Sequence, residues 1–197
     1  TNANIATGVT LKLQDKLTVN GTAKLTFENN ASLVQTSTTA TNNNSGEIYY
    51  KRHTTAVRRY DFTYWSSPVT PQTLYNLSPN TLGDKYYGFD SDANKYVIYY
   101  NGAHNMEPGL GYLVRAPQSF SITSPSIDTA PLFIGNPNNG LIEIPLVKAN
   151  QLYLLGNPYP SVIDADEFLK INNAGSNPIL DGTLYFWTHN SPPSNAV

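Results

Sequence analysis

The sequence predicts an all-β protein: a sandwich or jelly-roll-like module over residues 47–197, preceded by short β-rungs. Charged residues make up only 13% of the 197 residues, whereas Tyr and Pro number 14 each, a composition typical of turn-rich sheet proteins. Many short segments alternate apolar and polar residues with the period of two that strands require. Only residues 164–172 show a short helical pattern.

Residues 1–46 are expected to form a β-rung segment followed by a polar linker. Short rungs of apolar residues alternate there with polar ones, and the apolar set is Leu11, Leu13, Leu17, Val19, Leu25, Phe27, Leu33 and Val34. Asn20-Gly21 is a tight-turn signal between two of these runs. Such rungs are typical of a solenoid-like edge or of a meander, and the pattern leaves both open.

From residue 48 onward the strand signals strengthen, because aromatic and β-branched residues concentrate in them. We expect strands in "EIYYKRHTT" (47–55), "AVRRYDFTYWSSPV" (56–69), "GLGYLVRAP" (109–117), "GLIEIPLV" (140–147), "QLYLLGNPYP" (151–160) and "GTLYFWTHN" (182–190). The segment "KYYGFDSDANKYVIYYNG" (85–102) is expected to be a hairpin. Tyr60, Phe62 and Tyr64 share one strand face at period two.

Three acids cluster at the start of the helical pattern and could belong to an active site. Asp164 stands three residues before Glu167, the spacing of a capping box, and Asp166 lies in the same first turn. A glycosidase needs two carboxylates about 5–10 Å apart across a cleft, and adjacent acids on one turn supply at most one of them. We therefore interpret the cluster as a helix cap rather than as catalytic residues.

A calcium loop is suggested by Asp90, Asp92 and Asn94. The full pattern needs Gly at its sixth position and Glu at its twelfth, where this chain has Lys95 and Asn101. We interpret these residues as an Asx-rich hairpin turn, with weak calcium binding as the alternative. No other cofactor is expected, and the absence of Cys excludes disulfides and thiolate metal sites.

Charge and hydropathy narrow the classes of partner. The net charge of −2 provides no field that would attract nucleic acid. No apolar run approaches the roughly 18–20 residues that a membrane-spanning helix needs. The basic segment 51–59 is interpreted as a solvated strand face, with a patch that contacts glycan or phosphate as the alternative.

Trp65 and Trp187, together with the many tyrosines, are candidates for stacking against sugar rings. Both tryptophans stand in strands rich in apolar neighbours, which favours packing in a core or an interface. Glycan stacking by Trp65 and Trp187 is kept as the alternative.

Several uncommon strings occur together in one order: "RRYDFTYWSSPV", "TLYNLSP", "EPGLGYLVRAP", "LLGNPYPSVIDADEFL" and "GTLYFWTHNSPP". In this respect residues 47–193 resemble a module of very large secreted proteins of Bacteroidota, especially flavobacteria. Many of those proteins end in a type IX secretion sorting domain and are described as adhesins or as surface proteins associated with gliding motility. The resemblance implies export to the outer cell surface, and it brings no catalytic residues.

The resemblance offers one candidate modification site. Asp128-Thr129-Ala130 resembles the short acceptor of O-glycosylation used by secreted proteins of that phylum, with Thr129 as the modified residue. A plain turn between two strands is the alternative interpretation of these three residues.

The sequence therefore predicts a non-enzymatic, secreted cell-surface or adhesin segment that presents or spaces binding surfaces. Its expected partners are other domains of a larger surface protein, the secretion machinery, and glycans. The alternative is a carbohydrate-binding module of a secreted polysaccharide-degrading enzyme. We also expect that residue 197 is not a natural domain boundary, and that an exposed edge or apolar face lies near Leu184–Trp187.

Overall fold

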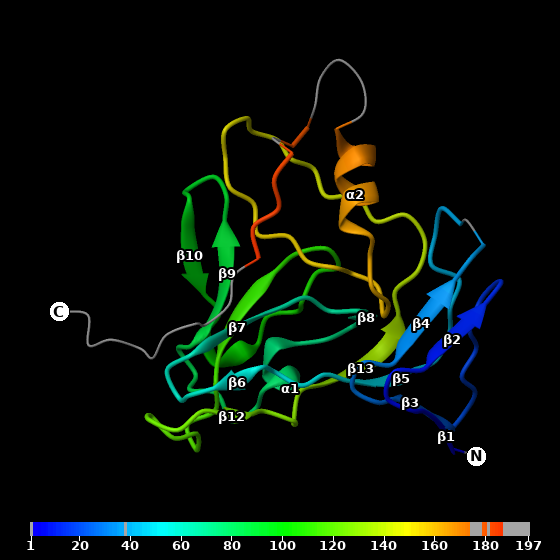
Figure 1. Ribbon diagram of the computed structural model, residues 1–197, viewed down its shortest axis with the longest axis horizontal. Helices are drawn as coiled ribbons and strands as arrows, with labels where there is room; N and C mark the ends of the chain where they lie inside the picture. The colour runs from blue at the N-terminus through cyan, green and yellow to red at the C-terminus, as the bar shows by residue number, and fades with distance from the viewer. Residues whose placement is uncertain (1, 38, 174–178, 181, 187–197) are drawn as a thin grey trace.

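The computed structural model describes residues 2–37, 39–173, 179–180 and 182–186, and they form an all-β, sandwich-like fold, as predicted. The larger sheet has the strand order β1 (Asn2–Ile5), β3 (Lys24–Phe27), β5 (Ile48–Lys51), β13 (Leu132–Pro137), β8 (Val69–Thr70). The four-stranded sheet has the order β10 (Lys95–Ile98), β9 (Tyr86–Asp90), β11 (Tyr112–Arg115), β7 (Phe62–Trp65). Two small sheets pair β2 (Thr10–Leu13) with β4 (Ser32–Gln35), and β6 (Ala56–Val57) with β12 (Ser126–Ile127). In Figure 1 the β9–β10 hairpin and strands β1–β4 lie on opposite sides of the molecule.

The rungs of the N-terminal segment are stacked in parallel. Strand β1 pairs with β3, β2 with β4, and β3 with β5, all in the parallel sense. The β1–β3 and β2–β4 pairings have the same sequence offset, since Asn2 lies opposite Lys24 and Thr10 lies opposite Ser32. A meander consists of antiparallel neighbours, so the solenoid-like expectation is confirmed and the meander is wrong.

The larger sheet extends across the expected boundary at residues 46–47. Strand β3 pairs with β5, so Leu25 lies opposite Ile48 and Phe27 opposite Tyr50. Both segments also contribute to one hydrophobic core, in which Phe27 and Ile48 are fully buried. Residues 1–46 and 47–173 thus share a sheet and a core, and a division into two folding units at residue 46 stays a prediction.

The core lies between the two main sheets. From the larger sheet it receives Tyr50 and Phe133, and from the four-stranded sheet it receives Tyr112 and Val114. The rings of Trp65 and Phe133 meet edge-to-face at 5.9 Å and join β7 to β13. Each fully buried aromatic or aliphatic side chain of this kind stabilises a fold by roughly 1.5–3 kcal/mol, so this contact area holds the sheets together.

Buried side-chain amides fasten the rungs to β13. The Asn44 side chain accepts hydrogen bonds from the Leu17 amide (2.7 Å) and from the Gln35 side chain (2.9 Å). Its Nδ2 donates to Gln35 Oε1 (2.8 Å) and to the Pro137 carbonyl (3.0 Å). Asn136 completes the link by donating to the Asn44 carbonyl at 2.8 Å. Asn44 is only 7% exposed, so this network replaces water for groups that would otherwise be buried without partners.

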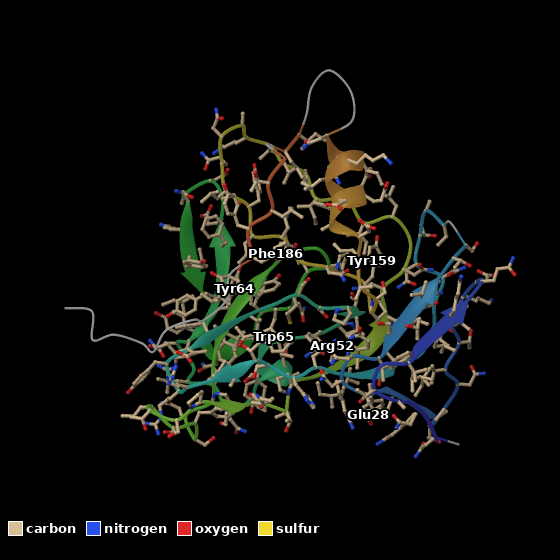
Figure 2. All side chains as sticks on the ribbon, in the orientation of Figure 1. Glu28, Arg52, Tyr64, Trp65, Tyr159 and Phe186 are labelled. Atoms are coloured by element: carbon tan, nitrogen blue, oxygen red, sulfur yellow. The ribbon has the colours of Figure 1, made fainter. Side chains whose placement is uncertain are left out.

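Arg52 fastens the turn between β3 and β4 to the end of β5 (Figure 2). Its guanidinium lies 3.7 Å from the Tyr50 ring centroid, and Nη2 donates to the Ala31 carbonyl at 2.7 Å. Burial lowers the pKa of Arg52 to about 10, so the group is still charged at neutral pH. Beside it, Lys51 forms an ion pair with Glu28 at 3.0 Å.

Three predicted strands are wrong, and the first two lie at residues 140–147 and 151–160. Residues 140–147 form no strand, although their alternation is real, since Ile142 and Ile144 lie against Gly109 while Leu141 is exposed. Pro145 has no N–H to offer a ladder, and side-chain packing replaces strand pairing there. Residues 151–160 make only the isolated bridge between Leu110 and Leu155 before the chain reaches Pro158.

The third wrong strand lies at residues 182–190. Its described part, residues 182–186, is not a strand, and the remainder lies outside the described residues. Tyr185 and Phe186 are 82% and 83% exposed, in agreement with the exposed apolar face expected near Leu184. A period-two or aromatic sequence does not by itself supply a neighbouring strand with which to pair.

Helical structure is sparse in the described residues. Besides the predicted helix α2 (Ala165–Asn172), it consists of α1 (Leu74–Leu77) and the 3₁₀ turn η1 (Tyr100–Gly102). Sequence reasoning missed α1, whose signal is Thr73, the N-cap that accepts from the Asn76 amide. None of the described helices is long and apolar enough to cross a bilayer.

Replacement of Asn44 tests the link between the rungs and β13. We expect Asn44→Ala to lower the free energy of unfolding by about 3 kcal/mol, because several buried partners lose their hydrogen bonds at once. The neighbouring Asn43 is exposed and serves as the control, with a change in Asn43→Ala below about 0.5 kcal/mol. Urea unfolding of both variants measures the difference, and equal losses would contradict a structural role for the amide network.

Alkaline pH should unfold the core through two buried tyrosines. Burial raises the pKa of Tyr86 and of Tyr112 to about 12, from the usual value of about 10. The folded state therefore holds these protons more tightly, and the stability they contribute is complete below about pH 10 and is lost as pH rises towards about 12. Phenolate absorbance and circular dichroism recorded together should show their ionisation coinciding with unfolding. A complete phenolate titration near pH 10 with an unchanged fold would rule this out.

Candidate functional site

The strand register gathers aromatic side chains on the face of the four-stranded sheet that points away from the core. Tyr64 lies opposite Leu113, Leu113 opposite Tyr87, and Phe89 opposite Tyr96. Alternation along each strand sends their neighbours Trp65, Tyr86 and Tyr112 to the core side. We call this surface the aromatic face; it consists of Phe62, Tyr64, Tyr87, Phe89, Tyr96, Ile98 and Leu113.

The rings of the aromatic face contact one another edge-to-face. Phe62 and Tyr87 meet at 5.7 Å between ring centroids, Tyr87 and Tyr96 at 6.3 Å, and Phe89 and Tyr96 at 5.3 Å. Each such pair adds about 0.5–1.5 kcal/mol beyond its buried area, so the rings hold one another in fixed orientations. The result is a rigid surface whose rings come from β7, β9 and β10, with Leu113 of β11 between them.

The hydroxyls of Tyr64 and Tyr96 are hydrogen-bonded to each other, 2.8 Å apart, across the aromatic face. Burial raises the pKa of the Tyr64 hydroxyl, and the hydrogen bond to Tyr96 raises it further, so Tyr64 is neutral at physiological pH. This pair supplies polar donors and acceptors beside apolar ring surface. Figure 2 labels Tyr64 together with its neighbour Trp65 in the four-stranded sheet.

Solvent reaches the aromatic face at β10. Tyr96 is 45% exposed and Ile98 is 36% exposed, while Tyr64, Tyr87 and Phe89 are half-buried. Clustered exposed apolar groups with polar atoms among them are typical of binding surfaces. The aromatic face is therefore the candidate functional site of the described residues.

Trp65, one of the two tryptophans kept as an alternative for glycan stacking, lies on the other side of the same sheet. It is half-buried and packs against Phe133, which agrees with the packing interpretation. Trp187 lies outside the described residues. Sequence reasoning placed Phe62 and Tyr64 on one face but missed Tyr87, Phe89 and Tyr96 as their companions. Period-two spacing within the predicted hairpin was a signal for these three residues. The register that brings the hairpin beside β7 cannot be read from the sequence.

The calcium candidates lie in the turn between β9 and β10. Asp90 Oδ1 accepts from the Ala93 amide at 3.0 Å, an Asx turn, and Asn94 has a positive φ of 49°. Asp92 forms an ion pair with Lys148 at 2.8 Å. No group of three or more His, Cys, Asp or Glu that could hold a metal occurs among the described residues. Each of these polar groups thus has a structural role, and calcium binding stays an untested alternative.

Thr129 lies in an exposed turn between β12 and β13. The preceding Asp128 is buried, and its Oδ1 accepts from the Ala130 amide at 3.0 Å. The Asp128 amide donates to Thr54 Oγ1 at 2.9 Å, which fixes the turn against the loop after β5. Thr129 is accessible to a modifying enzyme in this position, and its glycosylation stays a prediction.

The acids at the start of α2 form the predicted cap. Asp164 Oδ1 accepts from the amides of Asp166 and Glu167, both at 3.0 Å. The reciprocal half of the capping box is absent from the structure, since Glu167 instead forms an ion pair with Lys170 at 3.0 Å. Each of the three acids is therefore accounted for by helix formation.

Comparison with protein families places the whole chain in one of them. A family model matches residues 1–197. The chain belongs to the DUF8693 family. Its description reads "domain of unknown function", so membership assigns no role to particular residues. No curated protein and no solved structure matches the chain. The aromatic face therefore has to be interpreted from its own geometry.

The cap interpretation of Asp164 can be tested by two substitutions. Asp164→Ala should lower the free energy of unfolding by about 1 kcal/mol, because two amides of the first turn lose their acceptor. Asp164→Asn, which still offers an oxygen, should stay within about 0.5 kcal/mol of the parent. Thermal unfolding provides the comparison. Loss of a measured binding or catalytic activity in the folded Asp164→Asn variant would show that the acid does more than cap.

Proposed function

We propose that the chain is a non-enzymatic segment of a secreted cell-surface protein of the adhesin type, and that the aromatic face is its contact surface. The observation that carries this proposal is the cluster of Tyr64, Tyr87, Phe89 and Tyr96 on one sheet face, with Tyr96 and Ile98 open to solvent. Tyrosine is enriched at recognition surfaces because a rigid ring supplies contact area while its hydroxyl supplies a hydrogen bond.

Export by type IX secretion is part of the same proposal. Its support is the resemblance of residues 47–193 to modules of large secreted Bacteroidota proteins, and a low charge content with no Cys agrees with it. Other domains of such a surface protein, or the secretion machinery, would then be neighbours of this chain. The outer cell surface is the proposed location.

A carbohydrate-binding module is the second candidate. It is favoured by the hydroxyl pair of Tyr64 and Tyr96, which stands beside aromatic ring surface. Sugars present apolar C–H faces and hydroxyl groups side by side, so a ligand of this class would use both the rings and the hydroxyls. A surface adhesin that recognises glycans would unite the two candidates.

Binding to a glycan array, with a matched pair of tyrosine variants, tests the role of the aromatic face. We expect Tyr96→Ala to weaken binding at least about tenfold, because an aromatic anchor at the centre of a contact contributes about 1.4 kcal/mol or more. Tyr75 on α1 is 50% exposed against 45% for Tyr96, so Tyr75→Ala is the control and should bind like the parent.

The same experiment can contradict the proposal. Equal binding by the parent and the Tyr96→Ala variant would exclude the aromatic face as the contact surface. If no glycan bound the parent, the carbohydrate-binding candidate would fail. The adhesin candidate would then depend on whether Tyr96→Ala reduces attachment of the chain to cells.

A further inference from the structure

Two cationic residues lie at one end of the aromatic face. Arg115, the last residue of β11, lies opposite Phe62 in β7 and therefore shares its side of the sheet. The Arg115 amide donates to the Lys85 carbonyl at 3.2 Å, so Lys85 borders the same end of β11. Lys85 precedes Tyr87 by two residues, and side chains two residues apart along a strand point to the same face of the sheet. Neither cation was singled out by sequence reasoning.

The guanidinium of Arg115 is buried and has few partners. Arg115 is 6% exposed; its Nη2 donates to Gln118 Oε1 at 2.7 Å, and its Nε has no hydrogen-bond partner among the described residues. The ring of Tyr60 lies 5.6 Å from its central carbon. A guanidinium has five N–H donors, and burial without acceptors is unfavourable, so this group is suited to receive an acceptor from outside the chain.

Arg115 forms no ion pair with the described carboxylates around it. Lys85 forms an ion pair with Asp84 at 2.8 Å, which uses one Asp84 oxygen, while Asp84 Oδ1 is buried without a partner. The other nearby carboxylate, Asp61, lies 3.9 Å from the guanidinium of Arg58 and accepts from the Arg58 amide. Asp84 and Asp61 thus each pair with another cation, which leaves the Arg115 guanidinium available for a carboxylate.

We propose that the aromatic face binds an acidic polysaccharide, with sugar rings against Tyr96 and Phe89 and a uronate carboxylate at Arg115. This inference rests on the proposed glycan contact and names its chemical class. Arginine binds carboxylates through two parallel N–H donors, which fixes orientation as well as charge. Two residues of a strand span about 7 Å, so Arg115 and Leu113 are already that far apart along β11. A ligand that reaches from Arg115 past Leu113 to the rings of β9 and β10 must therefore be longer, which fits an oligosaccharide better than a single sugar.

Features of the aromatic face favour a sugar polymer over an acidic protein segment. An apolar side chain of a bound peptide would pack best on a purely hydrocarbon surface. The aromatic face instead carries the hydroxyls of Tyr64 and Tyr96 among its rings. Moreover, Arg115 and Lys85 lie together at one end of the face, whereas a run of acidic side chains would be matched by cations spaced along its length. The acidic peptide is therefore an outcome of the test rather than the proposal.

Calorimetric titration with polygalacturonate and with the same polymer fully methyl-esterified tests the inference directly. Esterification removes the negative charge but keeps the sugar rings. We expect polygalacturonate to bind at least about tenfold more tightly, with the difference shrinking as salt screens the charges. Poly-glutamate, an acidic peptide of comparable charge, should bind much more weakly than polygalacturonate.

Two variants locate the carboxylate. Arg115→Gln should remove most of the preference for the acidic polymer, whereas Arg115→Lys should keep part of it. Because Arg115 is buried, circular dichroism and thermal unfolding must show that each variant folds. Lys85→Gln, at a half-buried position, should lower the preference without risk to the core. Its control is Lys51→Gln, which removes a similarly ion-paired lysine from the larger sheet and should bind like the parent.

The outcomes separate this inference from the proposed function. Equal binding of the two polymers, with both weakened by Tyr96→Ala, would overturn the acid preference and leave the glycan contact standing. No binding of either polymer would overturn this inference, while binding of another glycan on the array would leave the glycan contact standing. Unchanged preference in folded Arg115→Gln and Lys85→Gln would overturn the site. Poly-glutamate binding as tight as that of polygalacturonate would show that charge alone is recognised.

Discussion

Strand β11 lies between β9 and β7, and its alternating side chains separate the interior of the protein from its aromatic face. Tyr112 and Val114 are buried in the core, so Leu113 and Arg115 must point to the opposite side. A slip of one residue would place Arg115 in the core and Tyr112 in solvent, which makes the register strongly specified. The composition of the aromatic face follows from this single constraint.

The larger sheet packs against the core side of the four-stranded sheet and so supports that arrangement. Phe133 of β13 contacts Trp65 of β7, so the position of β13 determines what packs against the core side of the four-stranded sheet. The Asn44 network in turn fastens β13 to the solenoid-like rungs through the Pro137 carbonyl. The rungs, the larger sheet and the aromatic face are therefore linked by one continuous set of packed and hydrogen-bonded side chains.

Local patterns predicted local structure well, and pairing between distant segments poorly. The β9–β10 hairpin and the cap at Asp164 each depend on residues close together in the sequence, and each is present. The alternation of residues 140–147 is equally clear, but none of the described strands pairs with it. Arg115 looked like an ordinary strand residue, because its contact with the Tyr60 ring exists only in the tertiary fold. A site built across four strands is visible only once their register is known.

The central claim is that one face of the four-stranded sheet recognises an acidic glycan from Arg115 to Tyr96. A titration of the isotope-labelled chain with galacturonate oligomers, followed by amide chemical shifts, tests it most directly. The account predicts shifts concentrated in β7, β9, β10 and β11, with the Arg115 side-chain resonance among the largest, while β1 and β3 stay unchanged. Shifts confined to the rungs, or none at oligomer concentrations well above the millimolar range, would contradict it.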